Sequence, residues 1–319
     1  MGVREDATET VSETLRMSEA GPLLTAWVSW FLAERGVRFL VIKGAALTHH
    51  GLRAARISSD VDVLVDPTDV DAAVVALVDA GWRLRPTTFA QQRYSEHSVS
   101  LIHNSWPIDI DVHHAFPGFL QDPTRTFDVL WERRETICIA DVPAPVPDRH
   151  SSALILALHS YRGRSAETRH SRELDELLVA LRSTDGDAYD LLALAVASGS
   201  DASLRDFFAD LGVAFSPSRG DDDPALIAWN ERVHSPSRSA HMWLHLIRSA
   251  RGWRKVEALR HAVWPNAEDL DILHSGGGRA ASQREYFRLR MRRLSRGVPV
   301  LRGMAALWWR RGPGSSSWS

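Results

Sequence analysis

Two stretches, SSDVDVLV at residues 58–65 and PIDIDVHH at residues 107–114, decide the fold that this sequence predicts. In both, Asp alternates with Val, Ile or Leu, and a period of two is typical of a strand with one apolar and one polar face. Asp60 and Asp62 therefore project from the same face of the first strand. The second strand repeats the pattern, so we expect two strands that carry acids on one face.

The segments around these strands predict an α+β core. The chain begins with a helix at 21–35, a strand closed by glycine at 37–44, a short helix at 45–52 and a loop at 53–59. The first acidic strand follows at 61–65, then an amphipathic helix at 69–81 and a hairpin at 98–114 that ends in the second acidic strand. This order predicts a mixed sheet with flanking helices. A Pro-rich stretch, DVPAPVPD at 141–148, marks a boundary, after which the pattern is helical.

We therefore expect four parts. They are an N-terminal helical segment (1–35), the α/β core (36–148), an all-helical domain (149–275) and an Arg-rich C-terminal helix with a frayed tail (276–319).

The composition excludes several classes of protein. The single cysteine, Cys138, can form neither an internal disulfide nor a cysteine-based zinc site. No apolar run approaches the roughly 18–20 residues of a membrane-spanning helix, and the polar N-terminus resembles neither a signal nor a transit peptide. We expect a cytoplasmic protein. Basic residues are almost all arginine, the lysines being Lys43 and Lys255.

The acids on the two strands point to a metal site. Neighbouring carboxylates repel and raise one another's pKa unless a cation neutralises them, and Mg²⁺ accepts carboxylate oxygens while leaving positions for water and phosphate. Three carboxylates from two neighbouring strands suit two-metal phosphoryl transfer. The third is Asp109 or Asp111, since both lie on the same face of the second strand. For a single Asp-x-Asp pair, the alternative to metal binding is a structural interpretation, in which the two acids are exposed to solvent at the end of a strand.

Three residues near the acids suit a triphosphate. Lys43 and Gly44 stand where a strand gives way to a helix, a junction that offers free backbone N–H groups to phosphate. Arg56 lies four residues before Asp60 and can donate two hydrogen bonds to a phosphate.

The order LVIKGAAL at 40–47, Arg56-x-x-x-Asp60-Val61-Asp62, an amphipathic helix ending in Ala80-Gly81-Trp82, and Ile110-Asp111-Val112-His113 resembles the uncharacterised nucleotidyltransferase family of the DNA polymerase beta-type superfamily. The resemblance covers roughly residues 36–185. It implies a polymerase beta-type core in which Asp60 and Asp62 bind metal, Asp111 is the third acid, and Lys43, Gly44 and Arg56 face the triphosphate. The Asp-x-His pattern favours Asp111 over Asp109. Lys43-Gly44-Ala45 departs from the usual Gly-Ser turn of that superfamily.

The interpretation is a Mg²⁺-dependent enzyme that moves a nucleotide from an NTP to an acceptor hydroxyl and releases pyrophosphate. The acceptor is a small molecule, a peptide or protein, or RNA. The alternative is a non-catalytic module on the same fold that binds a peptide or RNA through the Arg-rich C-terminus. A solvated helix is the simpler interpretation of that segment.

Three further polar residues have structural interpretations as well. His113 either orients Asp111 or is a hydrogen-bonded histidine at a strand end. His159 and Asp175 are expected to form a buried polar pair in the helical part.

Overall fold

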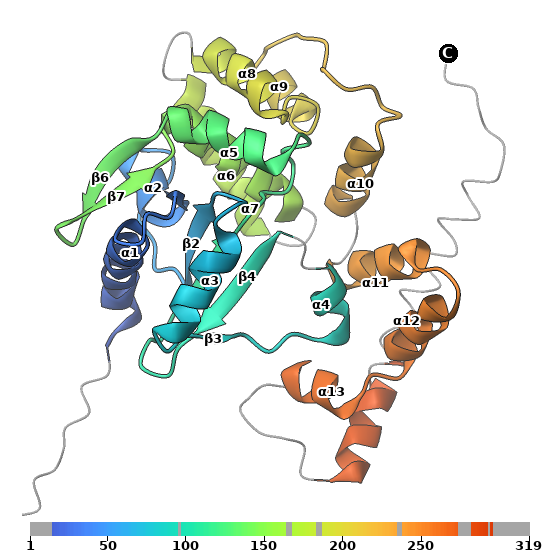
Figure 1. The fold of residues 1–319 in the computed structure, drawn as a ribbon. Helices are drawn as coiled ribbons and strands as arrows, with labels where there is room; N and C mark the ends of the chain where they lie inside the picture. Colours follow the sequence, from blue (N-terminus) through green and yellow to red (C-terminus); the bar gives the residue numbers. More distant parts are fainter. Residues whose placement is uncertain are drawn as a thin grey trace, which may run out of the picture. The chain divides into compact units, whose positions relative to one another are not determined.

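A computed structural model gives the fold and describes residues 15–94, 97–163, 168–182, 187–234, 238–273, 282–292 and 294–295. The contacts divide the chain into two units (Figure 1). The first lies within 1–85, 97–161 and 169–226, and the second within 86–96, 162–168 and 227–319. The boundaries at residues 35, 148 and 275 remain predictions of the sequence.

A five-stranded mixed sheet forms the centre of the first unit, as the sequence predicts. Its order is β1-β2-β5-β4-β3, and only the β2–β5 pair is parallel. The strands are β1 (Phe39–Ile42), β2 (Asp60–Val65), β3 (Arg83–Leu84), β4 (Ser98–Ile102) and β5 (Asp109–His113). The hairpin β4–β5 matches the prediction, and the two-residue strand β3 is an addition.

The apolar residues of the alternating strands form the core. Val61, Val63 and Val65 of β2 are buried together with Ile110 and Val112 of β5. Helices α1 (Met17–Ala33), α2 (Gly44–His49) and α3 (Val70–Asp79) follow the prediction closely, and α1 contacts β1 and β2. Burying the apolar set fixes the register of β2, since a slip by one residue would turn its acids into the core.

The Pro-rich stretch is a strand and not only a boundary. Strand β6 (Glu135–Ile139) pairs antiparallel with β7 (Val142–Val146), and both contact α1. Pro143 and Pro145 lie opposite Cys138 and Thr136. Proline has no N–H to donate, so it is tolerated where a strand has a partner on one side only. This hairpin forms a two-stranded sheet of its own.

Helices make up the rest of the first unit. Those from residue 149 onward follow the helical pattern of the sequence, whereas α5 (Pro123–Glu132) lies within the predicted α/β core and was not predicted. The former are α6 (Arg149–Gly163), α7 (Thr168–Arg182), α8 (Asp187–Ser198) and α9 (Arg205–Asp210). Helix α10 (Pro224–Val233) spans the division between the units. No helix in the described part of the chain is long and apolar enough to cross a membrane.

The second unit is built around Phe89. It contains α4 (Phe89–Tyr94), α11 (Arg238–Ser249), α12 (Trp253–Val263) and α13 (Ala267–Leu273), and α11 contacts both α4 and α12. The ring of Phe89 stacks on His261 at 3.9 Å, and its N–H donates to Asp269 Oδ1 at 2.7 Å. Residues 283–292 of the Arg-rich segment are helical, and the remainder of that segment lies largely outside the described residues.

Candidate active site

The acids meet because β2 and β5 pair in parallel. The register places Asp60 opposite Asp109 and Asp62 opposite Asp111. Ligand oxygens of Asp62 and Asp111 and a ring nitrogen of His113 lie within 4.8 Å of one another. The pairing of the two acidic strands, which the sequence predicts, is thus present.

Asp62 is the most strongly engaged of these acids. Its Oδ1 accepts from Lys43 Nζ at 2.7 Å and from His113 Nε2 at 2.8 Å. All three side chains are at most 10% exposed. Burial opposes ionisation of Asp62, but Lys43 and His113 outweigh it and hold the pKa of Asp62 well below its ordinary value. His113 therefore orients Asp62 through a hydrogen bond, where the sequence suggested Asp111.

The pKa of Asp60 is shifted in the opposite direction to that of Asp62. Burial and the neighbouring charges of Asp62 and Asp111 raise the pKa of Asp60, although the hydroxyl of Ser58 donates to it at 2.8 Å. Lys43 compensates only part of this repulsion. The cluster therefore holds negative charge that a further cation would stabilise.

The structure separates Asp109 from Asp111, which the sequence left open. Asp109 forms an ion pair with Arg85 on the neighbouring segment. Asp111 instead belongs to the group with Asp62 and His113.

The Lys43–Gly44 junction has an unusual backbone. Lys43 has a φ of 64° and Gly44 a φ of 38°. A positive φ is uncommon for a residue with a side chain and is held only where the surroundings impose it. Here it lies directly between β1 and α2, where Lys43 turns its ammonium group onto Asp62. The strand-to-helix junction predicted for this position is confirmed.

Arg56 lies in the predicted loop and is held by a helix that the sequence did not connect to it. It forms an ion pair with Glu173 of α7, and Arg53 Nη1 lies 3.6 Å from the same carboxylate. His170 Nδ1 and Ser160 Oγ donate to Glu173 at 3.1 Å and 3.3 Å. Burial opposes ionisation of Glu173, but His170, Arg56 and the other cations lower its pKa to about 2.

The buried acid in the helical part was therefore predicted wrongly. Asp175 is exposed, while Glu173 is buried and His159 contacts the ring of His170 at 5.1 Å. The signal in the sequence is the spacing of His170 and Glu173, since residues three apart lie on one face of a helix.

A cavity of about 840 Å³ opens beside the acids. Asp60, Asp62, Gly44 and Arg56 line one part of it. The remaining walls come from the first half of α1, from α2 and from residues 136–139 of β6. This volume is in the range of pockets that hold small ligands. The lining residues come from three segments that are far apart in sequence, 17–25, 41–62 and 136–139. The sequence did not predict that these segments would lie together.

The charge distribution predicts different effects of two similar substitutions. Asp62→Asn leaves Lys43 buried without its counter-charge, so without metal the free energy of unfolding should fall by roughly 3–5 kcal/mol. Asp60→Asn removes a repelled carboxylate and should be neutral or stabilising. Urea denaturation in the presence of a chelator measures the difference, and equal effects would contradict the Lys43–Asp62 assignment.

The low pKa of Glu173 predicts an acid-sensitive contribution to stability. Because its folded pKa of about 2 lies below the ordinary value of 4.5, the contribution is complete above about pH 5 and is lost as the pH falls towards 2. Glu173→Gln should cost on the order of 3 kcal/mol at pH 7, and this cost should shrink at pH 3.5. Glu176→Gln, an exposed change on the same helix, is the control in urea titrations. A cost that stays constant with pH would contradict the assignment.

Comparison with known proteins agrees with this geometry. The family described as "Uncharacterised nucleotidyltransferase" matches residues 25–208, and no curated protein matches the chain. Among solved structures, the lincomycin-bound lincosamide antibiotic adenylyltransferase LnuA is 14% identical, with a TM-score of 0.34, over 49% of this chain and 94% of its own. An antigenic nucleotidyltransferase-like protein from Paracoccidioides brasiliensis is 11% identical, with a TM-score of 0.36, over 59% and 92%. Such low TM-scores say nothing of the substrate. The family match covers more than half of the chain, which therefore belongs to the uncharacterised nucleotidyltransferase family.

Proposed function

We propose that this nucleotidyltransferase is Mg²⁺-dependent and moves a nucleotide from an NTP to an acceptor hydroxyl, with release of pyrophosphate. The observation that carries the proposal is the position of Asp60, Asp62 and Asp111. They lie on two parallel neighbouring strands, and the first two line a cavity of about 840 Å³. Carboxylates on adjacent strands beside a ligand-sized cavity are the arrangement that phosphoryl-transfer chemistry needs.

The residues present fit magnesium. Asp60, Asp62 and Asp111 offer hard carboxylate oxygens, which Mg²⁺ prefers. Burial is the first cause of the raised pKa of Asp60, and the charges of Asp62 and Asp111 add to it, so a cation beside Asp60 would favour its ionised form. When bound, Mg²⁺ supplies positive charge to the phosphates and to the attacking and leaving oxygens.

Lys43, Gly44 and Arg56 are proposed to face the triphosphate. Gly44 and Arg56 line the same cavity as Asp60 and Asp62. The Arg56 side chain pairs with Glu173 but is 32% exposed and lines the cavity, which supports a contact with a ligand there. Lys43 lies against Asp62, where its ammonium group can bridge the acid cluster and a phosphate.

Asp111 is proposed as the third metal ligand and as the group that helps to accept the proton of the attacking hydroxyl. It lies beside Asp62, whereas Arg85 already compensates the charge of Asp109. The proposal concerns nucleotides and hydroxyl acceptors as classes. Incubating the protein and Mg²⁺ with each α-labelled NTP and a cell lysate tests it, with label transferred to a lysate fraction as the expected result.

Two aspartates two residues apart should differ in their effect on transfer. Asp111→Asn should lower the rate of transfer by on the order of 10²-fold or more while Mg-NTP binding largely persists. Asp109→Asn should be milder, because its carboxylate pairs with Arg85. Single-turnover assays with α-labelled NTP measure both rates. The reverse ranking would assign the third metal ligand to Asp109.

Lys43→Arg should bind Mg-NTP nearly as weakly as Lys43→Ala. The ammonium group is 10% exposed and 2.7 Å from Asp62, and a planar guanidinium cannot occupy the same point. The expected loss is roughly 1.5–3 kcal/mol of binding free energy. Lys255→Arg, an exposed change at the other lysine, is the matched control in calorimetric titrations. Affinity equal to the parent in Lys43→Arg would remove Lys43 from the nucleotide site.

A further inference from the structure

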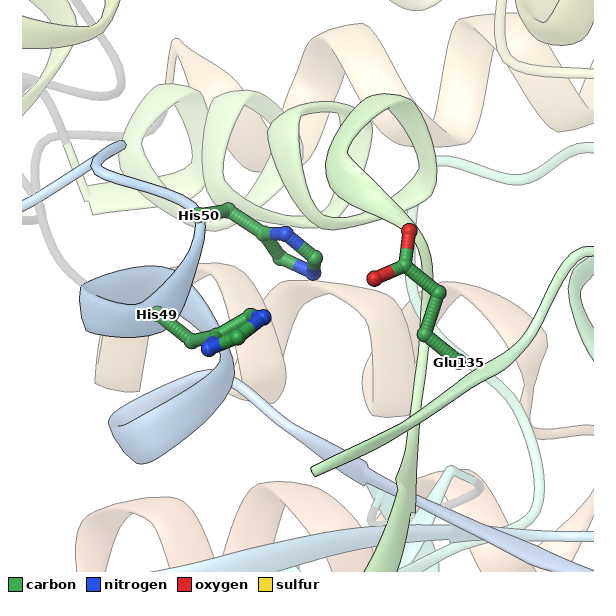
Figure 2. Close-up of side chains that lie close together, drawn as sticks. All are labelled: His49, His50 and Glu135. Carbon is green, nitrogen blue, oxygen red and sulfur yellow. The ribbon is translucent and has the colours of Figure 1, made fainter. Parts of the chain in front are cut away.

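A second group of side chains of the types that bind metal ions lies apart from the acid cluster. His49 is the last residue of α2, His50 follows it, and Glu135 is the first residue of β6. Ligand atoms of all three lie within 4.8 Å of one another. Figure 2 shows the two imidazole rings on one side of a shared space and the Glu135 carboxylate on the other.

A hydrogen bond to Pro147 fixes the tautomer and the orientation of the His50 ring. Nε2 of His50 lies 2.9 Å from the carbonyl oxygen of Pro147. A carbonyl oxygen can only accept, so Nε2 carries the hydrogen and the neutral ring keeps a lone pair on Nδ1. A hydrogen bond from one ring nitrogen to a backbone carbonyl is the usual support of a metal-binding histidine, because it fixes the tautomer and orientation of the ring.

The Glu135 carboxylate is available for a cation. Within the described part of the chain, no hydrogen bond or ion pair engages it, and the two arginines before it have other partners. Arg133 pairs with Asp148 at 2.6 Å, and Arg134 donates to the carbonyl of Trp131 at 2.8 Å. An isolated carboxylate beside two imidazoles favours binding of a divalent ion over repulsion of it.

We propose that His49, His50 and Glu135 bind a transition-metal ion, with zinc as the expected metal. Imidazole ligands select zinc and its neighbours and not magnesium. Two histidines, one glutamate and an open fourth position are a known zinc ligand set. His49 also lines the cavity beside the acids, so the open position can take water or a donor atom of a molecule in that cavity.

The ligands need only small movements to close on the ion. Bonds of 2.0–2.1 Å in a tetrahedral site place ligand atoms about 3.3 Å apart, compared with separations of up to 4.8 Å without metal. His49 and Glu135 are exposed and free to change rotamer, whereas His50 is held by Pro147. The bound ion would link α2 to the hairpin β6–β7, and both contribute to the cavity wall.

Calorimetric titration of the full chain with Zn²⁺, in excess Mg²⁺, tests the proposal. One saturable site is expected, and Glu135→Gln or His49→Gln should raise its Kd by at least about tenfold, since even losing an outer-shell partner costs 10–100-fold. Glu132→Gln and His234→Gln, exposed changes elsewhere, should leave the Kd unchanged. Zn²⁺ should also raise the Tm of the parent chain more than that of Glu135→Gln, because an ion that binds only the folded state stabilises it by an amount that falls as the Kd rises.

Three results would overturn the proposal. The first is the absence of saturable Zn²⁺ binding. The second is Zn²⁺ binding that survives Glu135→Gln but is lost in Asp60→Asn, which would place the ion in the acid cluster. The third is binding that survives Glu135→Gln but is lost in Glu173→Gln, which would place it at the group of His159, His170 and Glu173. None of these results depends on nucleotidyl transfer, so the metal site and the proposed reaction are tested separately.

Discussion

The charge balance between two parallel strands governs the first unit of this protein. Strands β2 and β5 pair in a register that brings the buried Asp62 level with Asp111, and the two carboxylates repel each other. The ammonium group of Lys43 compensates this repulsion, and a strained backbone conformation places that group there.

The helical part has a matching arrangement with the signs reversed, in which Glu173 draws Arg53 and Arg56 together. Arg53 would otherwise be costly to bury, and its surroundings lower its pKa to about 10. Burial is the first cause of that shift and the neighbouring Arg56 the second.

These two charged centres are joined by a short connection. Residues 53–59 carry both arginines and lead directly to Asp60, and Arg56 pairs with Glu173 while it also lines the cavity beside the acids. The loop has no regular secondary structure. Ion pairs of Arg53 and Arg56 with Glu173 hold its first half, and the carbonyl of Ser59 accepts from the Asp109 N–H at 3.1 Å at its end. The proposed metal site is acidic and the proposed phosphate site beside it is basic, so each would reduce the electrostatic repulsion within the other. Nucleotide and metal would then be bound by one continuous set of charges.

Much of the sheet could be predicted because its signals are local. The alternation in DVDVLV and IDIDV states which face of each strand is buried, and the glycine after Lys43 marks the start of α2. The contacts across the fold carry no such signal. The sequence around Arg56 does not predict its ion pair with Glu173, which lies more than a hundred residues later. Likewise, the sequence around Asp62 does not predict its contact with Lys43. The strand β7 was hidden by its prolines, which are normally read as breaks, and its pairing on one side explains why they are tolerated.

The N-terminal helix has a consequence for how this protein is produced. The family match begins at residue 25, inside α1, but Met17, Ser18, Gly21 and Pro22 belong to the cavity wall. An expression clone trimmed to the matched region would keep Asp60, Asp62 and Asp111 as well as Arg56 and Glu173. It would nevertheless lack one wall of the cavity. It would also expose part of the apolar core to solvent, since Ala20 and Leu24 are fully buried. Inactivity of such a clone would therefore say nothing about its chemistry.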